Sequence, residues 1–541
     1  MKRINYFFFI LIVSICVSCY EDKGNYDYID IENIEIEKFE PVYKTLGDTV
    51  KIEPKFNIDL PENASYLSYE WSIDGKKRPE DPNWNSRNFF WIADEIISTF
   101  NLILKVTDER YGISYMQQGY ISISGEFDAS FSWMILSEQE GKTMLSFFKT
   151  VDTEWSADWS SMTITEWKEY KDLYPSRNGG IELGQGPISM REHYCADYNV
   201  RAGNIWIFSE SGAIDLEGVG LTKDIDLNQT FMGGVPAGVT IQGGVFMIQT
   251  DVVYDQYGHL YSRVKSDNQL FNSDYFLPEP MKYEGKILEQ CEPVLGRYLM
   301  YTARYTPIID KKNSRLLSII DGKINWDDDP LKGAANIIEV PGDAVLGAGE
   351  VLPANYIPLN DFSGYEIVSM QYRKLTPVNS STTYPAFNIL FKNENGDLYL
   401  EEFALERESG ADGYYMEVSN VKVFELNGLG GIPSSMVIPP YTTSNYAFFA
   451  VGNVLYMLDK DTRILSKYLE FNAQITAMDA ENMQQNQYVA VGLENGEFHV
   501  INIVNAKNRP ETDRIMCSSK ERFGKILQIN WKIGNGYSSW N

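Results

Sequence analysis

The stretch QYVAVGLENGEFHVIN, residues 487–502, contains two short apolar runs on either side of a glycine turn. Gly496 permits the positive φ angle of a tight hairpin, and the alternation in EFHVIN is typical of a returning β-strand. A turn glycine, a polar residue and an alternating run also occur in EGKTMLSFF (140–148), AGNIWIFS (202–209), YGHLYSRV (257–264), DGKINW (321–326), NGDLYLEEF (395–403) and VGNVLYML (451–458). The sequence therefore predicts a series of β-hairpins from about residue 126 onward.

The spacing of these hairpins favours a β-propeller. A strand-rich repeat of 40 residues or more is typical of propeller blades, which are four-stranded sheets that cannot bury their faces alone. Seven glycine hairpins predict seven blades, and six or eight are also compatible with the uneven period. The terminal KILQINWKI (525–533) is expected to close the ring onto the first blade. Stacked solenoids and a series of separate sandwiches are the rival architectures.

A different all-β unit is predicted before the propeller, at residues 30–125. IDIENIEIEKFE, DTVKIEPKF and YISISG alternate apolar and polar residues, as half-buried strands do. YEWSIDG (69–75) and FNLILKVTDERYGISY (100–115) resemble strands of the polycystic-kidney-disease (PKD) type of immunoglobulin-like sandwich. The resemblance implies that Trp71 is a core tryptophan, that Asp108 caps a turn, and that the module acts as a spacer or docking surface.

The N-terminus is predicted to be a lipoprotein signal peptide, residues 1–18. Lys2 and Arg3 precede an apolar run that ends at Val17, too short to span a bilayer. In bacterial lipoproteins, cleavage falls just before a cysteine that is then acylated, and Cys19 follows the small residue Ser18. We therefore expect lipidation at Cys19 and an acidic linker over residues 19–29. An ordinary signal peptide with an incidental cysteine is the alternative.

The residues behind Cys19 indicate on which side of the membrane the chain works. Glu21 and Asp22 resemble the acidic export signal of Bacteroidetes lipoproteins that face the medium. CYEDKGNYDYIDI (19–31) and SWMILSEQEGKTMLSFF (132–148) resemble the Bacteroidetes PKD-like-family surface lipoproteins. That resemblance implies an outer-membrane lipoprotein encoded beside SusC/SusD-type nutrient importers, which capture glycans or peptides. It brings no catalytic motif with it.

Composition excludes some partners and some kinds of stabilisation. The formal net charge of −28 argues against nucleic acid, whose phosphates need lysine and arginine for neutralisation. Five cysteines fall to three when Cys16 is cleaved off and Cys19 is acylated. The remaining Cys195, Cys291 and Cys517 are odd in number and far apart, so we expect them to be packing residues.

Motifs for catalysis or metal binding are few. GKT (141–143) lacks the upstream glycine of a phosphate-binding loop. The three histidines have no partner at metal-ligand spacing, and His193 with Cys195 offers at most half a zinc site. The run Asp327–Asp329 lacks the alternation of a calcium loop, so a solvated loop is favoured. We predict no metal, no cofactor and no catalytic residue, although 75 acidic residues leave paired carboxylates open.

One aromatic cluster is the candidate ligand-binding site. WSADWSSMTITEWKEY (155–170) contains Trp155, Trp159, Trp167 and Tyr170 in an otherwise polar segment that does not alternate like a strand. Rings exposed on a loop can stack against sugars. They also serve in domain packing and in protein interfaces. The glycine-rich segments NGGIELGQGP (178–187) and MGGVPAGVTIQGG (232–244) are expected to be loops on the rim of the propeller (126–541), without a readable function.

Three functions are compatible with this organisation. The leading one is a non-enzymatic cell-surface lipoprotein that assists ligand capture or complex assembly in a SusC/SusD-type uptake system. The second is a surface glycoside hydrolase with carboxylates in the propeller funnel. The third is an adhesin that binds surface proteins. The ligand, glycan or peptide, is not specified by the sequence.

Overall fold

The computed structural model describes residues 31–532 apart from 32, 62–63, 96, 128–131, 156–161, 194–202, 248, 265–274, 295–304, 323–334, 376–383, 411–412, 440–444 and 482–487. The predicted lipid site at Cys19, the acidic pair Glu21 and Asp22, Trp159, Cys195 and the run Asp327–Asp329 lie outside the described residues. The chain divides into two compact units, residues 1–124 and 125–541.

The first unit is a β-sandwich. Its larger sheet has the order β1-β6-β5-β3 and its smaller sheet pairs β2 with β4. The strands are β1 (Val42–Thr45), β2 (Thr49–Ile52), β3 (Leu67–Ile73), β4 (Phe89–Ile92), β5 (Ile97–Asp108) and β6 (Ile113–Ser124).

Aromatic residues fill the core of the sandwich, as the sequence predicted for Trp71. Trp71 is fully buried, and its ring lies 5.0 Å from Phe89 and 5.4 Å from Phe39. Its indole Nε1 donates to the carbonyl of Ser86 at 3.0 Å, so the one polar atom of the side chain is satisfied. Asp108 accepts a hydrogen bond from the backbone N–H of Arg110, which confirms the predicted turn cap.

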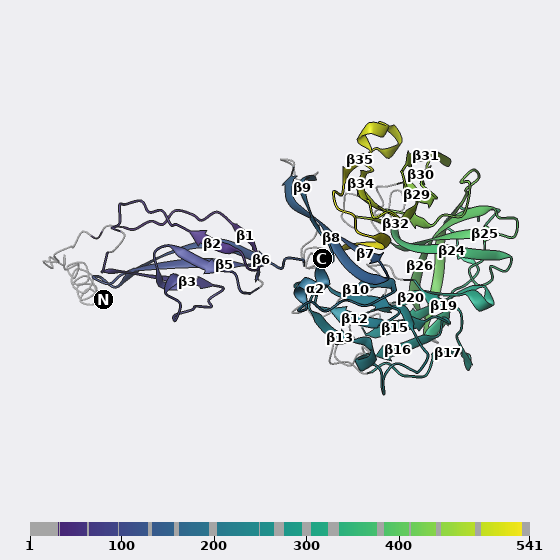
Figure 1. Ribbon diagram of the computed structural model, residues 1–541, viewed down its shortest axis with the longest axis horizontal. Helices are drawn as coiled ribbons and strands as arrows, with labels where there is room; N and C mark the ends of the chain where they lie inside the picture. The colour runs from purple at the N-terminus through teal and green to yellow at the C-terminus, as the bar shows by residue number, and fades with distance from the viewer. Residues whose placement is uncertain are drawn as a thin grey trace, which may run out of the picture. The chain divides into compact units, whose positions relative to one another are not determined.

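The second unit is a seven-bladed β-propeller. Six of its sheets contain a four-stranded antiparallel meander and one has three strands, counted over the described residues (Figure 1). Blade 1 contains β36 (Lys525–Lys532), β7 (Ser132–Gln139), β8 (Lys142–Trp155) and β9 (Met162–Tyr170). Blade 2 contains β10 (Pro187–His193), β11 (Asn204–Ser209), β12 (Gly212–Leu216) and β13 (Lys223–Asp226). Blade 3 contains β14 (Ile241–Phe246), β15 (Thr250–Asp255) and β16 (Leu260–Val264).

The remaining blades follow the same order from the innermost to the outermost strand. Blade 4 contains β19 (Cys291–Pro293), β20 (Tyr305–Asp310), β21 (Arg315–Ile320) and β22 (Ile337–Glu339). Blade 5 contains β24 (Tyr365–Leu375), β25 (Tyr384–Asn393), β26 (Leu398–Gly410) and β27 (Gly413–Glu425), with β23 (Ala344–Val345) added at its edge. Blade 6 contains β28 (Ser435–Val437), β29 (Tyr446–Val451), β30 (Val454–Asp459) and β31 (Ile464–Glu470). Blade 7 contains β32 (Ile475–Ala480), β33 (Tyr488–Leu493), β34 (Phe498–Asn502) and β35 (Ile515–Ser518).

The short elements outside the blades are the helix α2 (Leu173–Arg177), the hairpin β17 (Lys282–Tyr283) and β18 (Lys286–Ile287), and several single turns of 3₁₀ helix. The predicted closing strand is confirmed, because β36 pairs antiparallel with β7. Apolar clusters fill the interface between each blade and the next. The cluster between blades 7 and 1 includes Trp133, Phe498 and Trp531. Since this interface joins the two ends of the unit, the ring is closed.

Side chains also connect neighbouring blades near the centre of the ring, where backbone groups of the innermost strands face a different sheet. Gln528 of blade 1 accepts from the N–H of Met190 in blade 2 at 2.8 Å and donates to its carbonyl at 3.0 Å. Asp479 of blade 7 accepts from the N–H of Trp531 in blade 1 at 2.6 Å. These bonds satisfy backbone groups that no adjacent strand of the same sheet can reach.

Five of the seven predicted glycine hairpins connect the two central strands of a blade. Their glycines have φ angles between 60° and 90° and are Gly141, Gly258, Gly396, Gly452 and Gly496. The other two segments are placed differently. Gly203 precedes β11 and Gly322 follows β21. The central turn of blade 2 is formed by Glu210 and Ser211. The central turn of blade 4 is a 3₁₀ turn that is followed by Ser314, whose φ is 50°. A serine therefore takes the left-handed conformation that the pattern assigned to glycine.

Candidate functional site

The two glycine-rich segments lie at one end of the propeller. In an antiparallel four-stranded blade, the turn between the central strands and the link from the outermost strand to the next blade lie at the same end of the sheet. Residues 178–186 lie in the link between blades 1 and 2, and residues 232–240 lie in the link between blades 2 and 3. The loops are shorter than the sequence predicted, because Pro187 begins β10 and residues 241–244 belong to β14. We call this end, which also carries the central turns at Gly141 and Glu210, the hairpin end.

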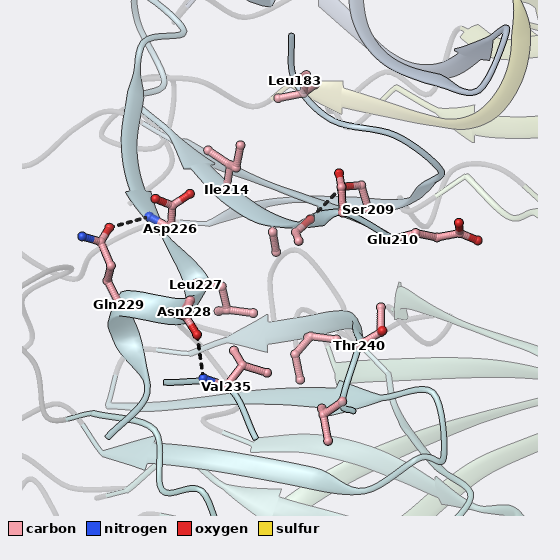
Figure 2. A pocket seen from close by; sticks show the side chains of 15 residues that line it. Leu183, Ser209, Glu210, Ile214, Asp226, Leu227, Asn228, Gln229, Val235 and Thr240 are labelled. Atoms are coloured by element: carbon pink, nitrogen blue, oxygen red, sulfur yellow. Dashed lines mark hydrogen bonds between the residues drawn. The ribbon is translucent and has the colours of Figure 1, made fainter. Parts of the chain in front are cut away.

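A pocket of about 590 Å³ opens at the hairpin end between blades 2 and 3 (Figure 2). Its wall is formed by the central turn of blade 2, the end of β13 with the following 3₁₀ turn, and the link to β14. Leu183 of the first glycine-rich segment and Val235, Val239, Thr240 and Ile241 of the second line it. Residues of both glycine-rich segments, for which the sequence predicted no function, therefore line the same pocket. Its volume is in the range of small-molecule binding sites.

The lining combines an aliphatic surface with polar groups on both sides of the pocket. The aliphatic side chains include Ile214, Leu227 and Val239. The polar groups come from Ser209, Glu210, Ser211, Asp226, Asn228, Gln229 and Thr240. Among these lining residues there is no aromatic ring, no lysine and no arginine, so the charge of the pocket comes from carboxylates alone.

The first glycine-rich segment lies close to the β11–β12 turn, which carries Glu210 and Ser211 at one side of the pocket. Gly184 and Gly186 have φ angles of 137° and 65°. A Cβ on Gly186 would lie 2.7 Å from Cγ and Cδ of Glu210, and one on Gly184 would lie 2.5 Å from the hydroxyl of Ser211. The backbone N–H of Glu210 donates to the carbonyl of Gly186 at 2.8 Å. Glycine is favoured at both positions because both have a positive φ, and a Cβ there would in addition meet the side chain of Glu210 or Ser211.

Most polar groups of the pocket already have partners within the wall. Asn228 accepts from the N–H of Val235 at 2.9 Å, and Gln229 accepts from the N–H of Asp226 at 3.1 Å. Asp226 forms an ion pair with Lys223 at 2.7 Å. The exposed Glu210 carboxylate, in contrast, forms no hydrogen bond or ion pair with any residue of the described chain. Figure 2 shows Glu210 and Asp226 on opposite sides of the pocket.

Trp167 and Tyr170 of the predicted ligand-binding cluster do not line this pocket, and residues 162–170 form the strand β9 where the sequence predicted a loop. Trp155 ends β8, where its backbone pairs with Met162 at the start of β9. Trp167 and Tyr170 are half-buried on β9, and their rings lie 4.9 Å from Phe148 and 5.3 Å from Phe127. These two rings pack within the propeller. A bulge in the β8–β9 ladder breaks the alternation of the strand, which explains the wrong loop prediction.

The histidines serve the fold. His193 is buried, and its Nε2 lies 2.9 Å from Oδ1 of Asp215. His259 lies beside β16, where its ring nitrogen is 3.0 Å from Asp255. His499 is in β34, as predicted, and burial lowers its pKa to about 4. No group of three or more histidine, cysteine or acidic residues with metal-binding geometry occurs within the described ranges.

The two described cysteines, Cys291 and Cys517, are free, and burial raises the pKa of each thiol to about 12. Such thiols are poor nucleophiles at neutral pH, which agrees with their expected role in packing.

One buried carboxyl group was not foreseen. Glu401 on β26 is fully buried between blade 5 and the segment that contains Ile357, whose N–H donates to Oε2 at 2.9 Å. Its Oε1 has no hydrogen-bond partner. Burial raises the pKa of Glu401 to about 8, so the group is mostly protonated at neutral pH. The period-two pattern of β26 gives no signal for it, because Glu401 and Glu402 are adjacent and both buried.

The fold and the pocket together define a class of protein, a β-sandwich followed by a seven-bladed β-propeller with a ligand-sized pocket between two blades. The model of the PKD-like family matches residues 19–187 of the chain. That match includes the sandwich and continues through β7, β8 and β9 of the first blade and the following helix α2. The expected resemblance to the PKD-like family is therefore confirmed for this part of the chain.

Solved structures similar to the chain include a quinonprotein alcohol dehydrogenase-like protein from Bacteroides thetaiotaomicron, at 13% identity and a TM-score of 0.37 over 91% of this chain and 96% of that one. The WD40 domain of Neurospora crassa Pan2 is similar at 10% identity and a TM-score of 0.34, over 63% and 82% of the two chains. At these scores the likenesses carry no argument about function. No curated protein matches the chain. Within its described part, no helix is both long and apolar enough to cross a membrane.

Proposed function

We propose that the protein is a non-enzymatic, lipid-anchored accessory component of an outer-membrane nutrient importer of the SusC/SusD type, and that its propeller holds the nutrient. The observation that carries the proposal is the pocket between blades 2 and 3, a concave site with an aliphatic wall and polar groups on both sides. Such a site is the default candidate for binding a small ligand or a ligand side chain.

The sequence supports the cellular part of the proposal. Cys19 follows a short apolar run and precedes Glu21 and Asp22, the arrangement of an exported lipoprotein. An acyl anchor supplies membrane affinity, while the following polar residues supply reach. The sandwich then serves as a spacer or docking element, and the importer pair is the partner that receives the nutrient.

Purification of the native lipidated protein from outer membranes in mild detergent tests this role. We expect a TonB-dependent barrel and a SusD-type lipoprotein to co-purify in stoichiometric amounts. A protein with Cys19 replaced by alanine, which cannot be acylated, should not recover them from membranes. Recovery of the lipidated protein alone would contradict the accessory role.

A further inference from the structure

One of the two carboxylates that line the pocket, that of Glu210, has no cationic partner in the described chain. Asp226 is paired with Lys223 at 2.7 Å and caps the 3₁₀ turn Leu227–Thr230. Glu210 has no such partner in the described chain, although it lies at the edge of a pocket. A carboxylate held beside a cavity without a counter-charge favours a cationic group in the ligand.

The position of Glu210 is set by the fold rather than left to a flexible turn. Its backbone N–H is bonded to Gly186, and its Cγ and Cδ lie directly over Gly186, which has no side chain to obstruct them. The hydroxyl of Ser211 in the same turn accepts from the N–H of Gln185 at 2.9 Å. These hydrogen bonds join the turn to the glycine-rich segment. The backbone that carries the Glu210 side chain is therefore fixed in position.

The rest of the pocket matches an aliphatic chain better than a sugar ring. Ile214, Leu227, Val235, Val239 and Ile241 give an apolar wall. The lining contains no aromatic face against which a pyranose ring could stack. Lysine and arginine carry a cation at the end of an aliphatic stem, which packs on apolar surface while the charged group stays polar.

We propose that the pocket binds a lysine or arginine side chain of a peptide, with the stem along the aliphatic wall and the cation at Glu210. This inference rests on the proposed role in nutrient capture and selects peptide over glycan as the nutrient. The overall charge of −28 attracts cations to the whole protein surface without specificity. The test must therefore distinguish binding at Glu210 from this general electrostatic attraction.

The experiment measures equilibrium binding of short peptides to the full chain in detergent at physiological ionic strength. The probe is the acetylated, amidated pentapeptide Gly-Gly-Lys-Gly-Gly, compared with its arginine and norleucine analogues. Norleucine keeps the aliphatic stem of lysine and removes the cation. We expect the lysine and arginine peptides to bind about tenfold more tightly than the norleucine peptide.

Glu210→Gln should weaken binding of the lysine peptide about tenfold and leave the norleucine peptide unchanged. The matched control is Glu494→Gln, because Glu494 is an exposed residue in the corresponding turn of blade 7 and does not line the pocket. Equal binding of the lysine and norleucine peptides would overturn the inference. An equal loss in both variants would overturn it as well, since the effect would then come from the general field.

An oligosaccharide and 1,5-diaminopentane test whether the ligand is a peptide, independently of whether the protein takes part in nutrient capture. Tight binding of an oligosaccharide, abolished when the pocket is filled, would overturn the peptide assignment and keep the role in nutrient capture. Binding of free 1,5-diaminopentane as tightly as the lysine peptide would also overturn the assignment to a peptide. The co-purification with the importer tests the accessory role independently of either result.

Discussion

Replacement of Glu401 by glutamine should raise the stability of the propeller at alkaline pH and leave it almost unchanged at acid pH. Burial raises the pKa of this carboxyl from 4.5 to about 8. In the unfolded chain the group loses its proton near its ordinary pKa, whereas in the folded chain it keeps the proton until about pH 8. The unfolded state is therefore increasingly favoured as the pH rises from 4.5 to 8, and the loss levels off above that window.

The size of the effect follows from the two pKa values. Each unit of pKa difference corresponds to about 1.4 kcal/mol, so the wild-type protein should lose about 3.5 kcal/mol between pH 5 and pH 8 through this group alone. Glutamine retains an oxygen for the N–H of Ile357, which donates at 2.9 Å, and it cannot ionise. The gap between Glu401→Gln and wild type should grow by about 3.5 kcal/mol over the same range.

Urea titrations of both proteins at half-unit steps of pH measure this gap. Other titrating groups change both curves alike, so the difference isolates Glu401. Glu408→Gln on the same strand is the control, because Glu408 is exposed and its replacement should shift the free energy of unfolding by less than about 0.5 kcal/mol at every pH. Parallel curves for wild type and Glu401→Gln from pH 5 to pH 8 would show that Glu401 does not keep its proton in the folded chain over this range.

Three further changes test the fold and the shape of the pocket. Gln528→Leu removes both hydrogen bonds to Met190 at the joint of blades 1 and 2, and should lower the free energy of unfolding of the propeller by about 2 kcal/mol in urea titrations. Trp71→Ala should destabilise the sandwich by about 3–5 kcal/mol, seen in calorimetry as a shift of one transition while that of the propeller stays in place. Gly186→Ala should cost more than Gly179→Ala, because both glycines have a positive φ and a Cβ would meet the side chain of Glu210 only at Gly186. Equal losses of stability in the two glycine variants would show that a Cβ at Gly186 does not clash with the side chain of Glu210.

Local features of the fold could be predicted from the sequence because they depend on neighbours in the chain. The hairpin turn at Gly496, the buried Trp71 and the cap at Asp108 each follow from a short pattern. The closing strand β36 could be predicted because a propeller leaves its first blade incomplete until the last strand arrives. The turn of blade 4 was missed because Ser314 adopts a conformation that the pattern reserves for glycine.

The pocket could not be predicted from the sequence in the same way. Leu183, the Glu210 turn and Val239 are brought together only by the packing of blade 2 against its neighbours. The sequence predicted both glycine-rich segments as loops, yet it did not show that residues of both line one pocket. The density of aromatic residues in 155–170 predicted a ligand-binding site, whereas the rings of Trp167 and Tyr170 pack against Phe148 and Phe127. A free carboxylate such as Glu210 is one of 75 acidic residues until its surroundings are known.

Filling the pocket tests most directly the claim that the propeller holds a ligand there. Val239→Trp places an indole in the cavity from the second glycine-rich segment, and Val345→Trp adds the same group at an exposed position of blade 5. Binding of a panel of peptides and oligosaccharides is then measured for wild type and both variants. We expect wild type and Val345→Trp to bind the same ligands, and we expect Val239→Trp to lose them while its thermal transition is retained. Unchanged binding by Val239→Trp would contradict it.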